Sequence, residues 1–443
     1  MKTLLKDKSK YVYVQYLILF IALVLHIIYA LRVNYDISTH DLGDIWDPSF
    51  VSHGHLAYIL NFYNNKAFAD VYEGQFYHPP LFHIVGAIVL AIFRVGDSSE
   101  RLIRAFECLQ ILNTLVSCVG IFYGYRILRK ILKKESYITA GTALLAAFPC
   151  FYYVGTALNN DCFSITFAIM AIYYTLIWSE KRCVKNIIKI AVCIILSMWS
   201  KTSGILIAPA IGAVFLYCLI KNRSETKDII RQYVIFAVVC VPLGLAWIIR
   251  CFIKFGITPN YALDLGSGSD QYVGNASLWE RIGIPKLSLL TTYGMYDLDV
   301  DKNSNIWRQT FFSMNFDEAL PTINSDCGLI FAAAMMLISM AVILCLFILM
   351  VKGVCDRSVN LELKLLFGIG WLTVFGFYIN FTFKYQQMCT MNFRYIVPTI
   401  IFLCVGAGLG LEHMGGKRWI SAILEGLMYL YAVMASLLFL IFL

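Results

Sequence analysis

Eleven apolar runs, most of them close to the length of a membrane-spanning helix, constrain this chain more than any other feature of its sequence. A helix needs about 20 residues to cross a bilayer. The runs cover residues 11–31, 102–125, 137–158, 163–178, 187–199, 204–220, 233–252, 328–351, 365–383, 396–411 and 420–442. Only 14% of the residues are charged, whereas about a quarter are charged in soluble domains. The sequence therefore predicts an all-α polytopic membrane protein with about eleven transmembrane helices, the first of them an uncleaved anchor.

A further apolar segment, Leu81–Phe93, is shorter than a span, which favours a buried or interfacial helix. If it does not cross the membrane, most of the 36 lysines and arginines lie on the side of the N-terminus, including the cluster at 126–134. If it crossed, that cluster and the next basic loops would be exported, against the positive-inside rule. We therefore expect a cytoplasmic N-terminus, an outer C-terminus and most acidic residues at the outer face.

The first predicted outer loop, residues 34–101, gathers polar groups in an otherwise apolar chain. Between residues 36 and 83, its histidines and acids are His40, His53, His55, His78, His83, Asp36, Asp41, Asp44, Asp47, Asp70 and Glu73. A solvated loop can carry such groups without a function. Clustered ionisable groups in a membrane protein more often mark a site, so the loop predicts a polar ligand at the outer face.

Three later positions place polar groups at the same predicted face. Asp161 is either a helix cap or a site residue. Lys201, alone in a short turn, either extends to the headgroups or balances an anion. Arg394, followed by Tyr395, is either a headgroup anchor or a phosphate clamp, because the guanidinium fork suits phosphate oxygens.

Residues 254–326 form a predicted outer loop. Loops of this length without secondary structure are uncommon in compact domains, and those that occur are usually functional or disordered. Its aromatic residues include Trp279, Trp307, Phe311, Phe312 and Phe316. They argue for a cap lying on the membrane. The predicted organisation is an N-terminal transmembrane module (1–253), this cap, and C-terminal transmembrane helices (327–443).

Cysteine and charge usage exclude other classes. Most of the fourteen cysteines lie in apolar runs and lack metal-binding spacing, so we interpret them as small core residues. The net charge of +8 is explained by the basic loops that orient membrane proteins, and no nucleic-acid partner is expected.

Four motifs, in this order and sidedness, carry a resemblance to a known family. They are the aspartates of ThrHisAspLeuGlyAsp, the ProPro step that opens a short helix, the lone turn lysine, and the late ArgTyr before an apolar helix. Together they resemble the GT-C glycosyltransferases, especially the dolichyl-phosphate-mannose protein mannosyltransferases and the bacterial lipid A aminoarabinose transferases. The resemblance covers about the first half of the chain and the rest loosely. It implies a GT-C fold and transfer of a hexosyl or pentosyl group from a polyprenyl-phosphate-linked donor.

The resemblance also implies roles for individual residues. The catalytic acid falls on Asp41, which is followed by Leu where many relatives have Glu, so Asp44 shares or replaces part of its role. Asp161 matches an acid at the outer end of the fourth span. The donor phosphate is expected to contact His78, Lys201 and Arg394. His78 stands where some relatives have a lysine.

A compatible mechanism follows from the residues themselves. The chain has no Walker or GxGxxG loop and its polar cluster faces outward, so an activated group must arrive through the lipid. Asp41 is expected to act as general base on an acceptor hydroxyl, with inversion at the anomeric carbon, while cations stabilise the leaving phosphate. The sugar or acceptor pocket is expected to include His40, His55, Tyr58, Asp161 and Tyr395. His55 and Tyr58 share a helix face and either line this pocket or pack the loop.

No cofactor is required by this mechanism, although Asp41, Asp44 and His55 offer hard ligands for a divalent metal. An O-antigen ligase or polymerase, with a similar outward site, is one alternative. A transporter or flippase is another, but it usually needs ionisable or broken-helix sites at mid-membrane. The partners are a lipid-linked donor, the bilayer and an acceptor that is a glycolipid, a cell-wall polymer or a protein. The expected location is a bacterial plasma membrane, or the ER membrane in a eukaryote.

Overall fold

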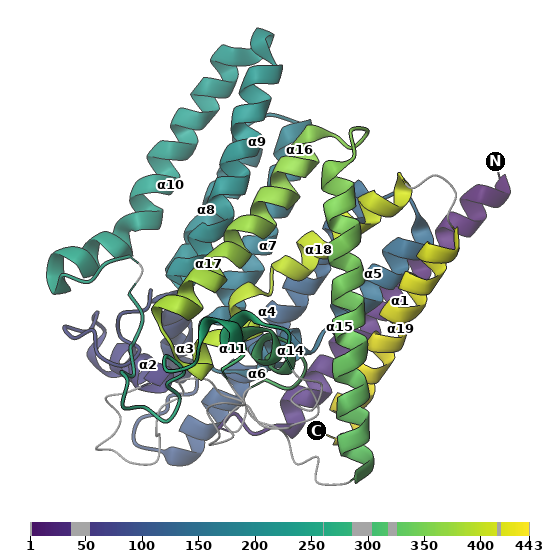
Figure 1. Cartoon of the computed structure of the whole chain (residues 1–443). Helices are drawn as coiled ribbons and strands as arrows, with labels where there is room; N and C mark the ends of the chain where they lie inside the picture. The colour runs from purple at the N-terminus through teal and green to yellow at the C-terminus, as the bar shows by residue number, and fades with distance from the viewer. Residues whose placement is uncertain are drawn as a thin grey trace. The chain divides into compact units, whose positions relative to one another are not determined.

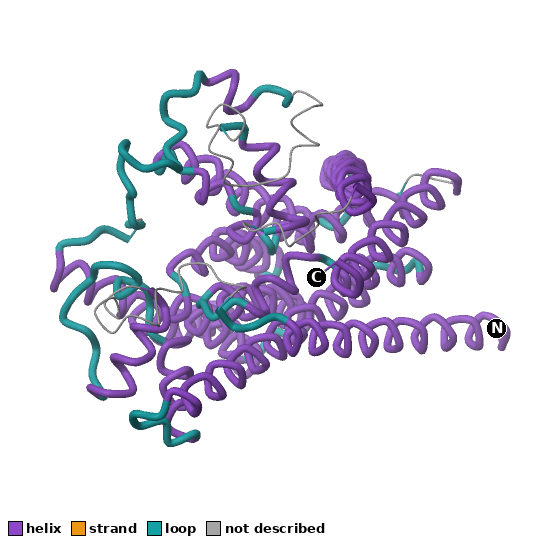
Figure 2. The backbone as a smooth tube through the Cα atoms, turned by 90° about the horizontal axis from the view of Figure 1, so that it is seen from below, coloured by secondary structure: helices purple, strands orange, loops and turns teal. Residues whose placement is uncertain are grey.

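The structure is a computed structural model that describes residues 2–36, 54–259, 261–285, 304–317, 326–413 and 418–442. Within these ranges the chain is built from helices and turns, and no strand is present apart from one isolated bridge between Tyr272 and Gln387 (Figure 2). The first α-helices are α1 (Lys2–Arg32), α2 (Gly54–Asn65), α3 (Leu81–Ile92), α4 (Ser99–Ile131), α5 (Glu135–Ala147), α6 (Pro149–Thr156), α7 (Asp161–Glu180), α8 (Val184–Ser200), α9 (Ala208–Lys221) and α10 (Thr226–Phe255). The later ones are α11 (Leu278–Ile282), α14 (Ile306–Phe316), α15 (Asp326–Cys355), α16 (Leu361–Lys364), α17 (Gly370–Lys384), α18 (Thr399–Glu412) and α19 (Arg418–Leu437). The all-α membrane fold predicted from the apolar runs is confirmed.

Nine helical segments of the described chain are long and apolar enough to cross a membrane, so the predicted number of eleven is not confirmed. The two remaining runs form shorter helices. α8 has 17 residues and packs between α7 and α10. α18 has only 14 residues and is buried on nearly all sides, as expected for a helix that is apolar all round. A helix enclosed by protein does not have to match the thickness of the bilayer.

The short helix predicted after the double proline is confirmed as α3, with 12 residues and Pro80 at its N-cap. Proline suits this place because the first turn of a helix has no partner for its N–H groups. α3 is therefore a short apolar helix, well below the length of a span.

The chain divides into two compact units. The first unit comprises Met1–Leu25, Gly124–Phe151 and Asp264–Leu443, and the second comprises His26–Tyr123 and Tyr152–Leu263. The three-part organisation expected from the sequence stays a prediction.

In the second unit, α7, α8, α9 and α10 pack side by side (Figure 1). The first-loop helices α2 and α3 pack on each other and share a hydrophobic core with α4 and α7. In that core Ile59 and Phe82 are fully buried, and the rings of Phe82 and Phe163 lie 5.8 Å apart. The polar first loop is thus held on the helices by apolar burial.

In the first unit, α15 packs closely on α18, and α19 packs on α5 (Figure 1). Glycines set the distance between α15 and α18. A Cβ on Gly353 would lie 2.5 Å from the carbonyl oxygen of Gly406 and 2.8 Å from the amide nitrogen of Gly410. Small residues at such a crossing allow two backbones in a membrane to touch.

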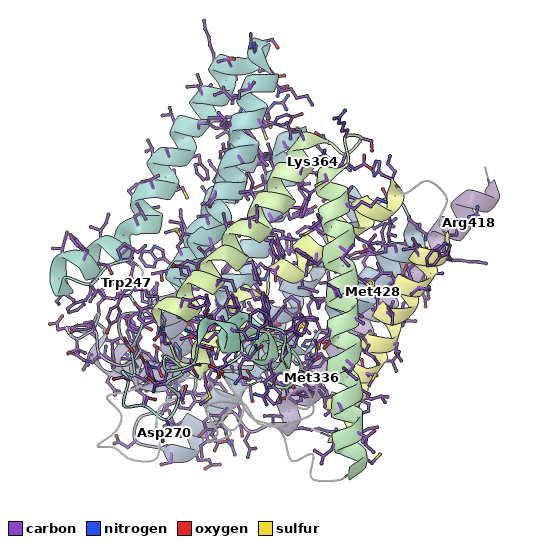
Figure 3. The ribbon with its side chains drawn as sticks, in the orientation of Figure 1. Trp247, Asp270, Met336, Lys364, Arg418 and Met428 are labelled. Atoms are coloured by element: carbon purple, nitrogen blue, oxygen red, sulfur yellow. The ribbon has the colours of Figure 1, made fainter. Side chains whose placement is uncertain are left out.

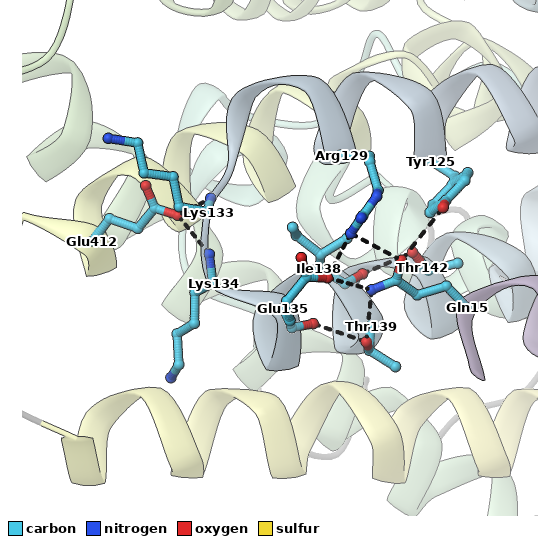
Figure 4. Close-up of polar contacts among 10 residues, drawn as sticks. All are labelled: Gln15, Tyr125, Arg129, Lys133, Lys134, Glu135, Ile138, Thr139, Thr142 and Glu412. Atoms are coloured by element: carbon cyan, nitrogen blue, oxygen red, sulfur yellow. Dashed lines mark hydrogen bonds and ion pairs between the residues drawn. The ribbon is translucent and has the colours of Figure 1, made fainter. Parts of the chain in front are cut away.

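The basic cluster between α4 and α5 makes specific polar contacts within the first unit (Figure 4). Arg129 forms an ion pair of 2.5 Å with Glu135. The carboxylate of Glu412 accepts from the backbone N–H groups of Lys133 and Lys134, at 2.5 and 3.0 Å, and Lys134 Nζ lies 2.7 Å from Glu425. These contacts tie the turn to α18 and α19.

The predicted cap contains ordered helices. In α14, Phe312 and Phe316 are buried and the helix packs against α15. Trp279 on α11 is 76% exposed, as expected for an aromatic residue that lies at a membrane surface. The part of the cap between 286 and 303 lies outside the described residues.

Candidate functional site

Asp161 and Lys201 form a buried ion pair in the second unit. Asp161 is the first residue of α7, and Lys201 is the C-cap of α8, which returns antiparallel to α7 across a short turn. The side chains are only 5% and 13% exposed. Each charge is thus balanced by the other inside the protein. The site roles expected of Asp161 and Lys201, including contact with a donor phosphate, stay predictions.

Two asparagines beside this pair were missed by sequence reasoning. Asn160 donates its amide to the Ser200 carbonyl (2.8 Å), and the Asn159 side chain accepts from the Asp161 backbone N–H (3.0 Å). Both are 1% exposed, and Asn159 Nδ2 and Asn160 Oδ1 have no hydrogen-bond partner in the described chain. A buried donor and a buried acceptor that lack partners suit the hydroxyls of a sugar or ordered water. The signal that could have identified them is the AsnAsnAsp sequence in a predicted outer link.

Three histidines and a tyrosine of the first loop form a second buried cluster in the same unit. His55 Nδ1 lies 2.9 Å from His83 Nε2, and the rings of His55 and His78 stack at 5.4 Å. Tyr58 stacks on His83 at 4.0 Å. His55 and Tyr58 therefore do share one face of α2, which His83 covers, and His83 is a residue to which the sequence assigned no role.

Burial lowers the pKa of His83 well below its ordinary value, the charge of His55 lowers it further, and the Pro79 carbonyl opposes both effects. Because the two imidazoles share one short contact, one ring must donate and the other accept. Which ring donates depends on the tautomers of His55 and His83. Burial also raises the pKa of Tyr58, so this phenol stays protonated.

The loop that carries His78 is anchored to α10. Trp247, which Figure 3 labels on α10, donates its indole N–H to the Tyr77 carbonyl at 2.9 Å. Arg250 donates to the Ala69 carbonyl at 2.8 Å. Lys254 forms an ion pair with Asp70. These contacts hold the backbone that precedes His78, so the position of this residue depends on tertiary structure.

Arg394 and Tyr395 belong to the first unit, where the backbone N–H of Arg394 is capped by the Asn392 side chain at 2.8 Å. Arg394 is 5% exposed and donates from Nη2 to the Tyr395 hydroxyl at 3.1 Å. Because Lys201 belongs to the other unit, a phosphate held by both residues stays a prediction.

His40, Asp41 and Asp44 lie outside the described residues. The predicted general base and two of the three metal ligands considered are therefore without a described position. Among the residues that the structure describes, no group of three His, Cys, Asp or Glu side chains is arranged to hold a metal ion.

Comparison with known proteins gives one family. Residues 77–253 match the family described as dolichyl-phosphate-mannose-protein mannosyltransferase. The match covers less than half of the chain and includes His78, Asp161 and Lys201. The resemblance read from the sequence is confirmed over this stretch. No curated protein matches the chain.

Among the solved structures similar to this one are two that each have 14% sequence identity and a TM-score of 0.49. The first is ArnT from Cupriavidus metallidurans bound to undecaprenyl phosphate, and the similarity covers 91% of this chain and 61% of that one. The second is the oligosaccharyltransferase of Archaeoglobus fulgidus in complex with zinc and sulfate, with 95% and 52% covered. The chain thus spans less than two thirds of the length of either protein.

Proposed function

We propose that this integral membrane protein is a glycosyltransferase that moves a sugar from a polyprenyl-phosphate-linked donor to an acceptor on the non-cytoplasmic face. The observation that carries the proposal is the match of residues 77–253 to the mannosyltransferase family. The same stretch contributes the Asp161–Lys201 pair and two of the clustered histidines, His78 and His83. The acceptor is a glycolipid, a cell-wall polymer or a protein, and the membrane is a bacterial plasma membrane.

In the proposed reaction, Asp41 takes the proton of the acceptor hydroxyl, and Asp44 supports or shares this role. The acceptor oxygen then bonds to the anomeric carbon, while the bond between that carbon and the phosphate oxygen breaks. The lipid phosphate leaves with the bonding electrons, and the configuration at the anomeric carbon inverts.

The leaving phosphate is stabilised by His78, Lys201 and Arg394 in this proposal. Stabilising charge that develops in the transition state is usually the largest catalytic contribution. An ammonium group has three N–H donors, so Lys201 can donate to a phosphate oxygen while it is paired with Asp161. Asp161 then orients the ammonium group.

The sugar or acceptor pocket is proposed to combine His40, His55, Tyr58, Asp161 and Tyr395 with the two buried asparagines. The unpaired amide atoms of Asn159 and Asn160 support this, because sugar hydroxyls both donate and accept hydrogen bonds. No metal is required in the proposal, so transfer should survive treatment with a chelator. Loss of transfer, restored by a divalent cation, would instead favour a site that uses Asp41, Asp44 and His55.

The proposal is tested with the full chain in liposomes and with a donor chosen by mass spectrometry of the lipid that copurifies. Asp41→Asn should lower transfer about a hundredfold or more, the usual contribution of a general base, at unchanged expression. Asp97→Asn is the matched control in the same loop, because Asp97 is exposed and has no role in the proposed site. Normal transfer by Asp41→Asn would remove the catalytic assignment, and solute uptake without any glycosyl product would favour a transporter.

A further inference from the structure

Arg281, in the first unit, is a buried cation that the proposed reaction does not use. It lies on α11 and is 2% exposed. Its Nη2 donates to the Thr382 carbonyl at 2.7 Å, and its guanidinium lies 4.6 Å from the centre of the Phe383 ring. Its Nε and Nη1 have no hydrogen-bond partner, and it forms no ion pair within the described chain.

A structural role explains only part of this arrangement. Thr382 lies in the last turn of α17, where an arginine commonly binds helix carbonyls. That contact uses one donor nitrogen and leaves two unpaired. Burying a charged group without partners is costly, so a site of this kind is stable when an anion completes it.

The surroundings of Arg281 place it at a membrane surface. Its neighbours on α11 and in the following turn, Leu278, Trp279, Ile282 and Ile284, are all exposed. A short helix with an exposed tryptophan and aliphatic side chains lies well in the interfacial layer of a bilayer. Arg281 is buried, whereas these neighbours on the same helix and turn are exposed.

An apolar cavity lies beside α11 in the same unit. Its volume is about 430 Å³, and Trp307, Leu344, Trp371 and Phe375 are among its lining residues. Trp307 donates its indole N–H to the carbonyl of Ile282, next to Arg281 in the chain, at 2.7 Å. Leu344, on α15, is 58% exposed, so one residue of the cavity wall also lies on the surface of the protein.

We propose that Arg281 binds the phosphodiester of an anionic bilayer lipid, one of whose chains enters this cavity. The ligand must join an apolar chain to an anion, because Trp307, which lines the cavity, bonds the carbonyl of Ile282, the residue that follows Arg281. One unpaired guanidinium carries one charge, which matches a phosphodiester better than a phosphomonoester, whose charge is about −1.5 to −2 at neutral pH. The proposal does not depend on sugar transfer, and its test measures binding alone.

The test uses the full chain in detergent with phosphatidylglycerol or phosphatidylcholine added. Native mass spectrometry measures lipid retention, and thermal unfolding measures protection. Arg281→Gln should weaken retention of phosphatidylglycerol about tenfold to a hundredfold, the range for hydrogen bonds to charged groups. Arg357→Gln, which changes an exposed arginine of the same unit, should retain phosphatidylglycerol as the unaltered protein does.

Thermal unfolding separates a binding site from a structural cap. Without added lipid, Arg281→Gln should unfold at the same temperature as the unaltered protein or higher, since an unpaired buried charge is gone. It should lose the stabilisation that phosphatidylglycerol gives. Equal destabilisation with and without the lipid would overturn the proposal. Equal protection of the unaltered protein by inorganic phosphate or a polyprenyl monophosphate would overturn the assignment to a bilayer phosphodiester.

Discussion

Breaking the Asp161–Lys201 pair should destabilise the second unit strongly, and the size of the effect follows from burial. Both side chains are almost completely enclosed, so removing one partner leaves an uncompensated charge inside the protein. Such a loss typically costs about 3–5 kcal/mol. At about 2–4 °C per kcal/mol for a unit of this size, Lys201→Met or Asp161→Asn should lower the unfolding temperature by about 10 °C.

The double variant should recover most of that loss, because neither charge then remains buried alone. Thermal unfolding of the two single variants and the double variant gives the coupling energy. The matched control is the pair of Arg104 and Glu100 in the same unit, whose side chains are 65% and 74% exposed. Its coupling should be less than about 1 kcal/mol.

Transfer activity then separates structure from chemistry. If Lys201 also binds the donor phosphate, the double variant should regain stability but not transfer. Lys201→Met should then weaken donor binding more than acceptor binding. If the losses of stability in the two single variants add up in the double variant, the two residues do not interact and the buried pair is refuted. A double variant that regains both stability and full transfer would remove Lys201 from the donor site.

Two further predictions concern pH and sidedness. Because the folded protein keeps His83 neutral, the unfolded chain binds more protons below about pH 6.5, so stability should fall by up to about 1.4 kcal/mol per pH unit as the pH drops. His83→Phe should flatten this slope in thermal unfolding between pH 7 and pH 5, and an unchanged slope would show that another group is responsible. Cys327 and Cys355 are exposed near opposite ends of α15, whose 30 residues extend about 45 Å. In a variant that lacks Cys108, an impermeant thiol reagent should therefore label Cys327 in intact cells. The same reagent should label Cys355 only after the cells are permeabilised. The reverse pattern would invert the topology and the proposed outer site.

Local patterns in the sequence were sufficient for most of the helices. Hydropathy identified the long apolar segments, and the double proline marked the start of α3, because both signals act within a few residues of the chain. The spacing of His55 and Tyr58 likewise predicted that they share a face. Hydropathy could not show that α18 is enclosed by other helices, since a buried helix and a lipid-facing one are equally apolar.

The composition of the site was only partly visible in the sequence. Asp161 and Lys201 were each identified as outer charged residues, yet their pairing depends on how α7 and α8 return on each other across 40 residues. His83 was counted among the polar groups of the first loop, but the sequence did not show that α2 places His55 against it.

The sequence by itself determined that this chain forms apolar helices and that its polar residues gather in the connections between them. The tertiary structure alone decided which polar residues are buried together: Asp161 with Lys201, His55 with His83, and Arg281 at the end of α17. Hydropathy and turn signals are local properties of the chain. The partner of a buried charge depends on the rotation and packing of helices that are distant in sequence, and only the folded chain fixes these.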